Sequence, residues 1–126
     1  MRQIVLDAGA LIALERGERE ARAYVFLAEQ GHATLVTSSA VVAQVWRGGA
    51  RQVRLARLLT SDLVTELPLD TDASRRIGAL AAAVGAADVV DGHVAVIALE
   101  RDAVVITSDP DDIARWGIDV QRIVTC

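Results

Sequence analysis

Apolar residues follow two patterns that alternate along the chain. Short continuous apolar runs, such as residues 4–6 and 103–106, are typical of strands buried on both faces, whereas apolar residues spaced three or four positions apart are typical of helices. From these patterns we predict strands at 3–6, 33–37, 63–67, 103–107 and 120–124. We predict helices at 8–16, 18–30, 40–47, 50–60, about 70–85, about 88–100 and from about 109 onward.

Helices that alternate with short strands predict an α/β fold. Parallel neighbours need a crossover connection, usually a helix, to bring the chain back to the same edge of the sheet. We therefore expect three layers, α/β/α, with helices on both faces of a mainly parallel five-stranded sheet. The 126 residues suffice for a single domain, 1–126, without a linker.

The composition is that of a globular protein from a reducing compartment. Hydrophobic residues make up 52% of the chain and charged residues 24%, which excludes a disordered protein. No apolar run reaches the ~18–20 residues of a membrane span, and a strand rather than a signal peptide is predicted at the start. The one cysteine, Cys126, provides neither a disulfide framework nor a thiolate metal site. We expect a cytoplasmic protein without membrane contact.

The charged residues narrow the function classes. All 13 basic residues are arginine, and the absence of lysine excludes P-loop and Schiff-base enzymes. The net charge of −4 opposes nucleic-acid binding by bulk electrostatics, so such binding would depend on a local basic surface. With two tryptophans, one tyrosine and one phenylalanine, base stacking cannot be its main mode.

Aspartates stand where ligands bind in α/β folds. Asp7 directly follows the first predicted strand, Asp109 follows the fourth, and Asp88 and Asp91 begin the helix before the fourth strand. Ligands of open α/β sheets bind beyond the carboxyl ends of the strands, where the strand order reverses. We therefore expect Asp7 and Asp109 to meet if their strands are neighbours.

Each of these aspartates alone is also typical of a helix start. Asp7, Asp88 and Asp109 stand at N-cap positions, and for any one of them capping is the preferred interpretation. The combination favours a shared site, because Asp91 lies inside the first turn of an apolar helix with small residues on its own face.

Three carboxylates gathered at one edge would need a cation. At a separation of ~5 Å and an effective dielectric near 20, each pair repels by about 3 kcal/mol. Oxygen ligands suit Mg²⁺ or Mn²⁺ better than Zn²⁺, and we interpret His32 and His93 as surface or packing residues rather than ligands. Such an ion can activate water for phosphoryl chemistry, which suits a chain without an evident catalytic base.

Three segments carry a resemblance to a known family: VLDAGALIAL at 5–14, VVDGHVAVIA at 89–98 and VITSDPDD at 105–112. With these motifs the whole chain resembles the PIN-domain ribonucleases, in particular the VapC toxins of bacterial VapBC toxin–antitoxin pairs. The resemblance implies a PIN fold and Mg²⁺- or Mn²⁺-dependent endonucleolytic cleavage of RNA. It also implies a homodimer and a VapB-type antitoxin whose C-terminal segment occupies the cleft.

The resemblance also assigns site residues by position. The catalytic and metal-binding acids of the family fall on Asp7, Asp91 and Asp109. Positions that support the site in the family fall on Asp88, Thr107 and Asp112.

Helix 40–47 departs from the family, which usually has a glutamate where Gln44 stands here. An amide oxygen can accept a water or touch a metal, but it contributes no charge. We place Gln44 on the wall of the cleft, on one face with Ala40, Arg47 and Arg51. The chain then either cleaves RNA with one firmly held metal, or is a catalytically weakened or inactive binding module.

The first acid is followed by Ala8 and Gly9 instead of the hydroxyl residue that the family often carries. We interpret the glycine as room for the backbone to approach the substrate. A phosphatase with an aspartate nucleophile is a rival, but Gly9 and the absence of lysine oppose it.

Two surfaces are candidates for partners. Arginines at 47, 51, 54 and 57 would form one stripe, either as a solvated face or for phosphate binding, and we assign RNA contact to Arg47 and Arg51. Residues 24–27 offer exposed apolar surface for a protein partner, although core packing is the preferred role for most of them.

Overall fold

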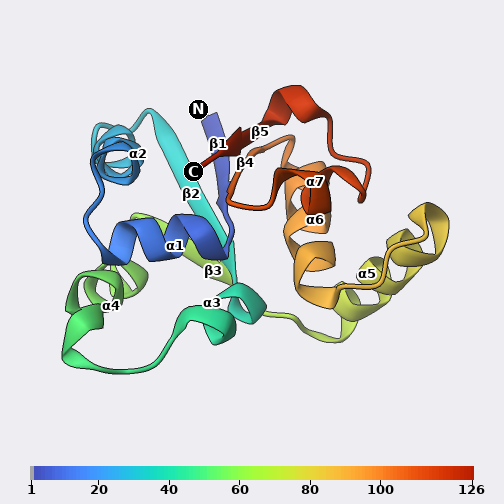
Figure 1. Cartoon of the computed structure of the whole chain (residues 1–126), viewed down its shortest axis with the longest axis horizontal. Coiled ribbons are helices and arrows are strands. Elements are labelled where there is room, and N and C mark those ends of the chain that lie inside the picture. Colours follow the sequence, from blue (N-terminus) through green and yellow to red (C-terminus); the bar gives the residue numbers. More distant parts are fainter. Residues whose placement is uncertain (1) are drawn as a thin grey trace.

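Five parallel strands form the centre of the fold, in the order β3-β2-β1-β4-β5 (Figure 1). The computed structural model describes residues 2–126. The strands are β1 (Arg2–Leu6), β2 (Ala33–Ser38), β3 (Val64–Leu67), β4 (Val104–Thr107) and β5 (Ile123–Thr125). The predicted α/β class is confirmed, and the sheet is parallel throughout its five strands.

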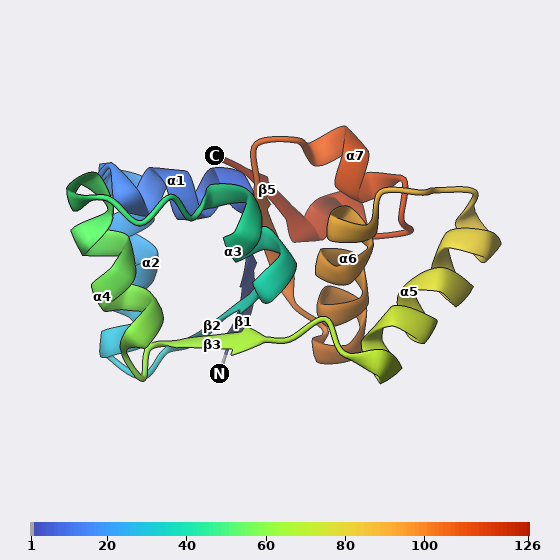
Figure 2. The same ribbon diagram turned by 90° about the horizontal axis from the view of Figure 1, so that it is seen from below.

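Helices cover both faces of the sheet (Figure 2). On one face lie α1 (Ala8–Glu15), α2 (Arg19–Glu29) and α4 (Val53–Thr60). On the other lie α6 (Val89–Arg101) and α7 (Pro110–Ala114), and α5 (Thr71–Val84) packs on the outer side of α6. The short α3 (Ser39–Val45) contacts both α1 and α6, so it bridges the two helical layers.

The core explains the continuous apolar runs of the sequence. Residues 4–7 and 105–107 are buried, because helices lie against both faces of their strands. In α6 every residue from 92 to 98 is buried, since this helix contacts β1, β2, β4 and the neighbouring α5 and α7. The helix fits tightly at Gly92, where an added Cβ would lie 2.6 Å from the ring of the buried Trp116.

Two predicted elements begin with a 3-10 turn in the structure. The predicted strand 120–124 is wrong in its first half. Val120–Arg122 form a 3-10 turn in which the Asp119 carboxylate accepts a hydrogen bond from the Gln121 N–H at 2.9 Å, and β5 begins only at Ile123. The predicted helix 50–60 begins as a separate 3-10 turn, Ala50–Gln52, before α4.

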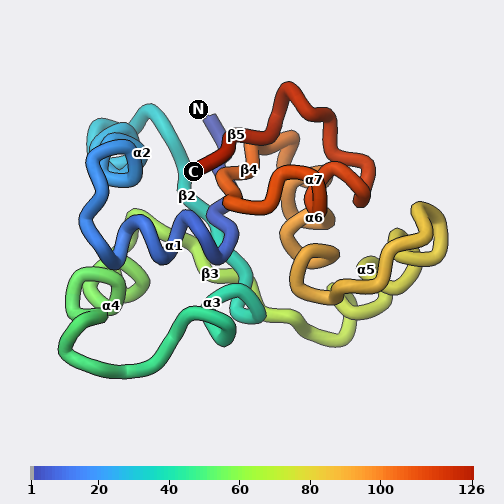
Figure 3. Tube along the Cα trace, viewed as in Figure 1, coloured from blue at the N-terminus to red at the C-terminus, as the bar shows by residue number. Residues whose placement is uncertain are grey.

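The connection between α3 and α4 runs along the lower edge of the molecule in the view of Figure 3. The predicted helix 40–47 ends at Val45, because Trp46 has extended backbone angles and Gly48 has a φ of +74°. Neither conformation continues a right-handed helix. Residues 46–49 therefore form an ordered loop of their own.

Within residues 2–126 there is no single helix with the length and apolar character to cross a membrane. Only the α5–α6 pair, bent by 97°, passes that test of length and composition when its two helices are taken together.

Candidate active site

The candidate site lies at the carboxyl edge of β1 and β4, where the strand order reverses. Leu6 pairs with Ile106 in the ladder, and the Asp7 N–H donates to the Ile106 carbonyl at 3.0 Å. The residues that follow the two strands are therefore neighbours, which meets the condition under which Asp7 and Asp109 were expected to lie close together. This is the switch point at which open α/β sheets bind ligands.

Thr107 joins the two strand ends through its side chain. Its hydroxyl donates to Asp7 Oδ2 at 2.7 Å and accepts from the Asp109 N–H at 3.0 Å. Asp7 and Thr107 are both buried, so these bonds are shielded from water. Thr107 thus fixes the orientation of the Asp7 carboxylate and the path of the chain into α7.

Of Asp7, Asp88 and Asp109, capping accounts for Asp88 alone. Asp88 Oδ1 accepts from the Asp91 N–H at 2.9 Å and caps α6. Asp7 and Asp109 occupy the N-cap positions of α1 and α7, but neither side chain makes a capping hydrogen bond. Capping therefore explains the position of Asp88 and leaves those of Asp7 and Asp109 to another role.

Asp91 lies in the electrostatic field of the other acids. Its half-buried position raises its pKa from 3.8 to about 6, mainly by desolvation, and the carboxylates of Asp88, Asp7, Asp112 and Asp109 raise the pKa further, in that order. The fold thus gathers both strand-end acids and the start of α6 at one edge of the sheet.

The donor chemistry of this edge suits a hard divalent cation, since the candidate ligands Asp7, Asp91 and Asp109 offer carboxylate oxygens. In the described part of the chain, no group of three or more His, Cys, Asp or Glu side chains is placed as a ready ligand set. The arrangement is therefore an acidic edge with suitable donors rather than a closed coordination cage.

The prediction that Gly9 makes room for the backbone to approach the substrate is wrong, because Gly9 has a packing role. A Cβ at this position would lie 1.9 Å from Ser108 Oγ and 2.8 Å from Ser108 Cβ. The space beside Gly9 is thus filled by Ser108 and does not open toward a substrate. The glycine allows the segment between Thr107 and Asp109 to pack against the start of α1, which no local sequence signal reveals.

Comparison with protein families identifies the architecture. The family model described as the PIN domain matches residues 4–117. The chain belongs to the PIN domain family. PIN domains are generally nucleases that use divalent metals, which supports a hydrolytic activity for this chain.

Solved structures agree with this fold. The chain resembles VapBC2 from Rickettsia felis bound to a promoter DNA fragment (TM-score 0.67, 15% identity, 98% of each chain covered). It also resembles a toxin–antitoxin complex from Klebsiella pneumoniae (TM-score 0.68, 22% identity, 97% of this chain and 96% of that chain covered). A third similar structure is FitAB bound to the IR36 DNA fragment (TM-score 0.63, 15% identity, 97% of this chain and 94% of that chain covered). No curated protein matches the chain in a sequence comparison. At these identities the structural likeness shows the PIN fold.

Gln44 is exposed on α3, the helix that bridges the two layers of the PIN domain. The expectation that it shares one helical face with Arg47 and Arg51 is wrong. Because α3 ends at Val45, both arginines lie beyond the helix, on the loop and on the 3-10 turn that follows.

Three of the four predicted arginines share a surface. Arg51, Arg54 and Arg57 line a hollow of about 410 Å³ together with Glu15 of α1. Arg47 stands apart on the loop, where its Nη1 donates to the Trp46 carbonyl at 2.7 Å. The predicted stripe is therefore broken between Arg47 and Arg51.

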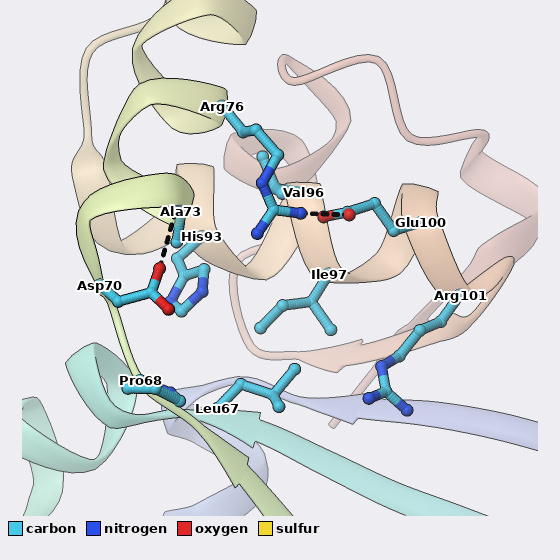
Figure 4. Close-up of a pocket in the computed structure, with 10 residues that line it drawn as sticks. All are labelled: Leu67, Pro68, Asp70, Ala73, Arg76, His93, Val96, Ile97, Glu100 and Arg101. Carbon is cyan, nitrogen blue, oxygen red and sulfur yellow. Dashed lines mark hydrogen bonds and ion pairs between the residues drawn. The ribbon is translucent and has the colours of Figure 1, made fainter.

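His93 is a packing residue, as expected. It is buried, and its Nδ1 lies 2.5 Å from Ser38 Oγ at the end of β2. Desolvation, and then the charge of Arg76, lowers the pKa of His93. The ring lines a hollow of about 200 Å³ between α5, α6 and the segment after β3, beside an ion pair of Arg76 with Glu100 (Figure 4).

Proposed function

We propose that this PIN domain is a divalent-metal-dependent endoribonuclease and the toxin of a type II toxin–antitoxin pair. Its reaction is the hydrolysis of RNA phosphodiester bonds with Mg²⁺ or Mn²⁺. One observation carries the proposal: the carboxylates of Asp7 and Asp109 are not used for capping and lie close enough to Asp91 to raise its pKa. Such mutual repulsion is a cost that a bound cation would relieve.

Each residue has a distinct role in this reaction. Asp7, Asp91 and Asp109 would hold the ion, which when bound supplies activation of water and neutralisation of charge that develops on the phosphate. Thr107 orients Asp7 through the 2.7 Å hydrogen bond. Asp88 and Asp112 add negative potential around Asp91.

RNA contact in this proposal falls on the two exposed arginines nearest to α3, Arg47 and Arg51. Both side chains are accessible, and local positive charge is needed because the net charge of the chain is −4. Arginine binds phosphate with two parallel N–H donors, which holds a strand in a defined register.

A VapB-type antitoxin and a second copy of the chain complete the proposal, with a cytoplasmic location. The solved structures that share the fold are described as VapBC, toxin–antitoxin and FitAB structures. On α2, Phe26 is 60% exposed, whereas Tyr24, Val25 and Leu27 pack partly against the core. A hollow of about 380 Å³ between α2 and α4 adds apolar surface that an antitoxin segment could cover.

The alternative is a PIN-fold binding module with weakened or lost activity. Two observations favour it: Gln44 brings no charge to the site, and the described acids form no ready ligand set. In that case RNA binding would persist while cleavage would be slow or absent.

Cleavage of an RNA substrate with and without Mg²⁺ separates these possibilities. We expect metal-dependent cleavage by the wild type, loss of cleavage in Asp7→Asn, and faster cleavage at low metal in Gln44→Glu, because the glutamate adds a charged donor. Asp62→Asn, an exposed aspartate in the turn before β3, is the matched control and should cleave like the wild type. Equal cleavage by Asp7→Asn and the wild type would refute the assignment of Asp7 to the active site. If no variant cleaves RNA, with or without Mg²⁺, the result supports the binding module.

A further inference from the structure

The loop of residues 46–49 is held by one buried side chain, the amide of Gln52. Its Oε1 accepts from the backbone N–H groups of Arg47 at 2.7 Å and Gly48 at 2.9 Å. Its Nε2 donates to the Val45 carbonyl at 2.8 Å and to Glu15 Oε1 at 2.6 Å. A carboxamide has two donors and two acceptor lone pairs, so all of its hydrogen-bonding capacity is used.

These four bonds tie the loop both to the end of α3 and to α1. Gln52 is only 6% exposed, and breaking one of its bonds would leave a buried polar group unpaired. The loop is therefore fixed in one conformation, although it contains two consecutive glycines. Sequence alone gave no signal for this role, because Gln52 lies among arginines in a segment that is otherwise typical of a solvated helix.

The fixed loop presents an aromatic side chain to solvent. Trp46 is 43% exposed, in contrast to the fully packed Trp116 at 2%. Its indole lies beside Gly48, where a Cβ would stand 3.6 Å from Trp46 Nε1. Exposing a large apolar ring is unfavourable, and holding it on a rigid loop preserves one defined ring face for a ligand.

One cationic side chain adjoins this ring. Arg47 follows it directly, with its guanidinium held by the Trp46 carbonyl, whereas Arg51 is exposed on the next turn and lines the hollow of Arg54 and Arg57. The nearby Glu15 carboxylate accepts a hydrogen bond from Gln52, on the inner side of the loop. A flat apolar face with positive charges on the adjoining backbone is complementary to one unstacked base and its phosphates.

We propose that Trp46 stacks on one unpaired base of the RNA while Arg47 binds the adjoining phosphate and Arg51 a phosphate farther along the strand, and that Gln52 holds this surface in place. The proposal rests on the ribonuclease function above and narrows its substrate to RNA that contains an unpaired base. A continuous duplex does not fit, because its bases are stacked within the helix. The arginines supply most of the affinity, and the tryptophan selects the single-stranded state.

Binding without metal tests this surface independently of cleavage. The probe is an unstructured ten-nucleotide RNA, compared with its blunt duplex and with an abasic strand of equal charge. We expect the single strand to quench the fluorescence of the exposed Trp46, and Trp46→Leu to raise its Kd about tenfold, which is the lower part of the range for loss of one stacked base. Trp46→Phe keeps an aromatic face, so its Kd for the single strand should rise less than that of Trp46→Leu.

Two controls accompany these variants. Val120→Ala shortens an exposed apolar side chain on the 3-10 turn before β5 and should leave the Kd unchanged, which ties the effect to Trp46. Gln52→Glu keeps the acceptors but loses both N–H donors and faces Glu15 with a like charge, so it should weaken single-strand binding several-fold while Trp46 itself is intact.

Several results would overturn the proposal. Trp46→Leu binding as tightly as the wild type, or the abasic strand binding as tightly as the natural one, would show that only phosphates are recognised. Protection of Trp46 from acrylamide in the protein alone would show that a second copy covers it. If Asp7→Asn cleaves like the wild type but these binding results hold, the catalytic assignment fails and the RNA surface stands.

Discussion

Replacement of Asp91 by asparagine should stabilise the protein while it abolishes cleavage. The pKa of Asp91 is raised from 3.8 to about 6 in the folded state, so the native protein binds this proton more tightly than the unfolded chain does. The free energy of unfolding of the wild type therefore falls as the pH rises from about 4 to about 6, and it stays lower above that range. Asparagine is neutral at every pH, so the variant lacks this loss.

The magnitude follows from the same pKa. The full difference between 3.8 and about 6 would correspond to about 3 kcal/mol, as an upper bound. Because Asp91 is only half-buried, solvent screens the repulsion, and we expect a gain of about 1 kcal/mol at pH 7.5. In a domain of this size that is an increase in Tm of about 3–5 °C. At pH 4 the difference between variant and wild type should be close to zero.

Thermal or urea unfolding at pH 4 and pH 7.5, without divalent metal, measures this difference. Asp62→Asn serves as the matched control and should show no such dependence, since it lies in an exposed turn. Added Mg²⁺ should stabilise the wild type and narrow its gap to Asp91→Asn, because the cation relieves the same repulsion. The reasoning is refuted if Asp91→Asn shows an equal stability difference at both pH values.

Three further substitutions test the packing of the acidic edge. Thr107→Val keeps the shape of the side chain but removes the hydrogen bond to Asp7. It should lower the free energy of unfolding by about 2 kcal/mol and reduce kcat more than substrate binding. A change in stability without a change in kcat would contradict the orienting role. Gly9→Ala should lower the free energy of unfolding by about 1–3 kcal/mol, because its Cβ crowds Ser108. In urea unfolding, the double variant with Ser108→Gly should recover part of that loss. If it does not, the clash is not with Ser108. Gly92→Ala should lower Tm in a thermal melt, at a cost of about 1–3 kcal/mol, because its Cβ would lie 2.6 Å from a buried indole. An unchanged Tm would mean that α6 can shift freely.

Helices and strands could be predicted from the sequence because they depend on residues a few positions apart. Continuous apolar runs marked β1 and β4, and the caps at Ser38, Asp70 and Asp88 are hydrogen bonds within three residues along the chain. The errors also have local causes. The predicted helix 40–47 ends at Val45, because Trp46 has an extended backbone conformation. The predicted strand 120–124 begins as a 3-10 turn, which Asp119 caps.

The candidate site was predictable only in part. That Asp7 and Asp109 follow strands is visible in the sequence, and the resemblance to PIN domains supplied Asp91. The sequence could not show that Asp88 is a cap while Asp7 is not, since both stand directly before a helix. That difference is set by Thr107, which lies 100 residues from Asp7 in the chain and beside it in space.

The sequence by itself determined the alternation of strands and helices, the acids at the strand ends and the membership of the PIN family. The tertiary structure alone decided which strands are neighbours, that Ser108 fills the space beside Gly9, and that Gln52 fixes the loop of Trp46. The physical reason is the range of the forces involved: periodicity and capping act between residues a few positions apart. Strand order, close packing and buried hydrogen bonds arise only when distant segments fold against one another.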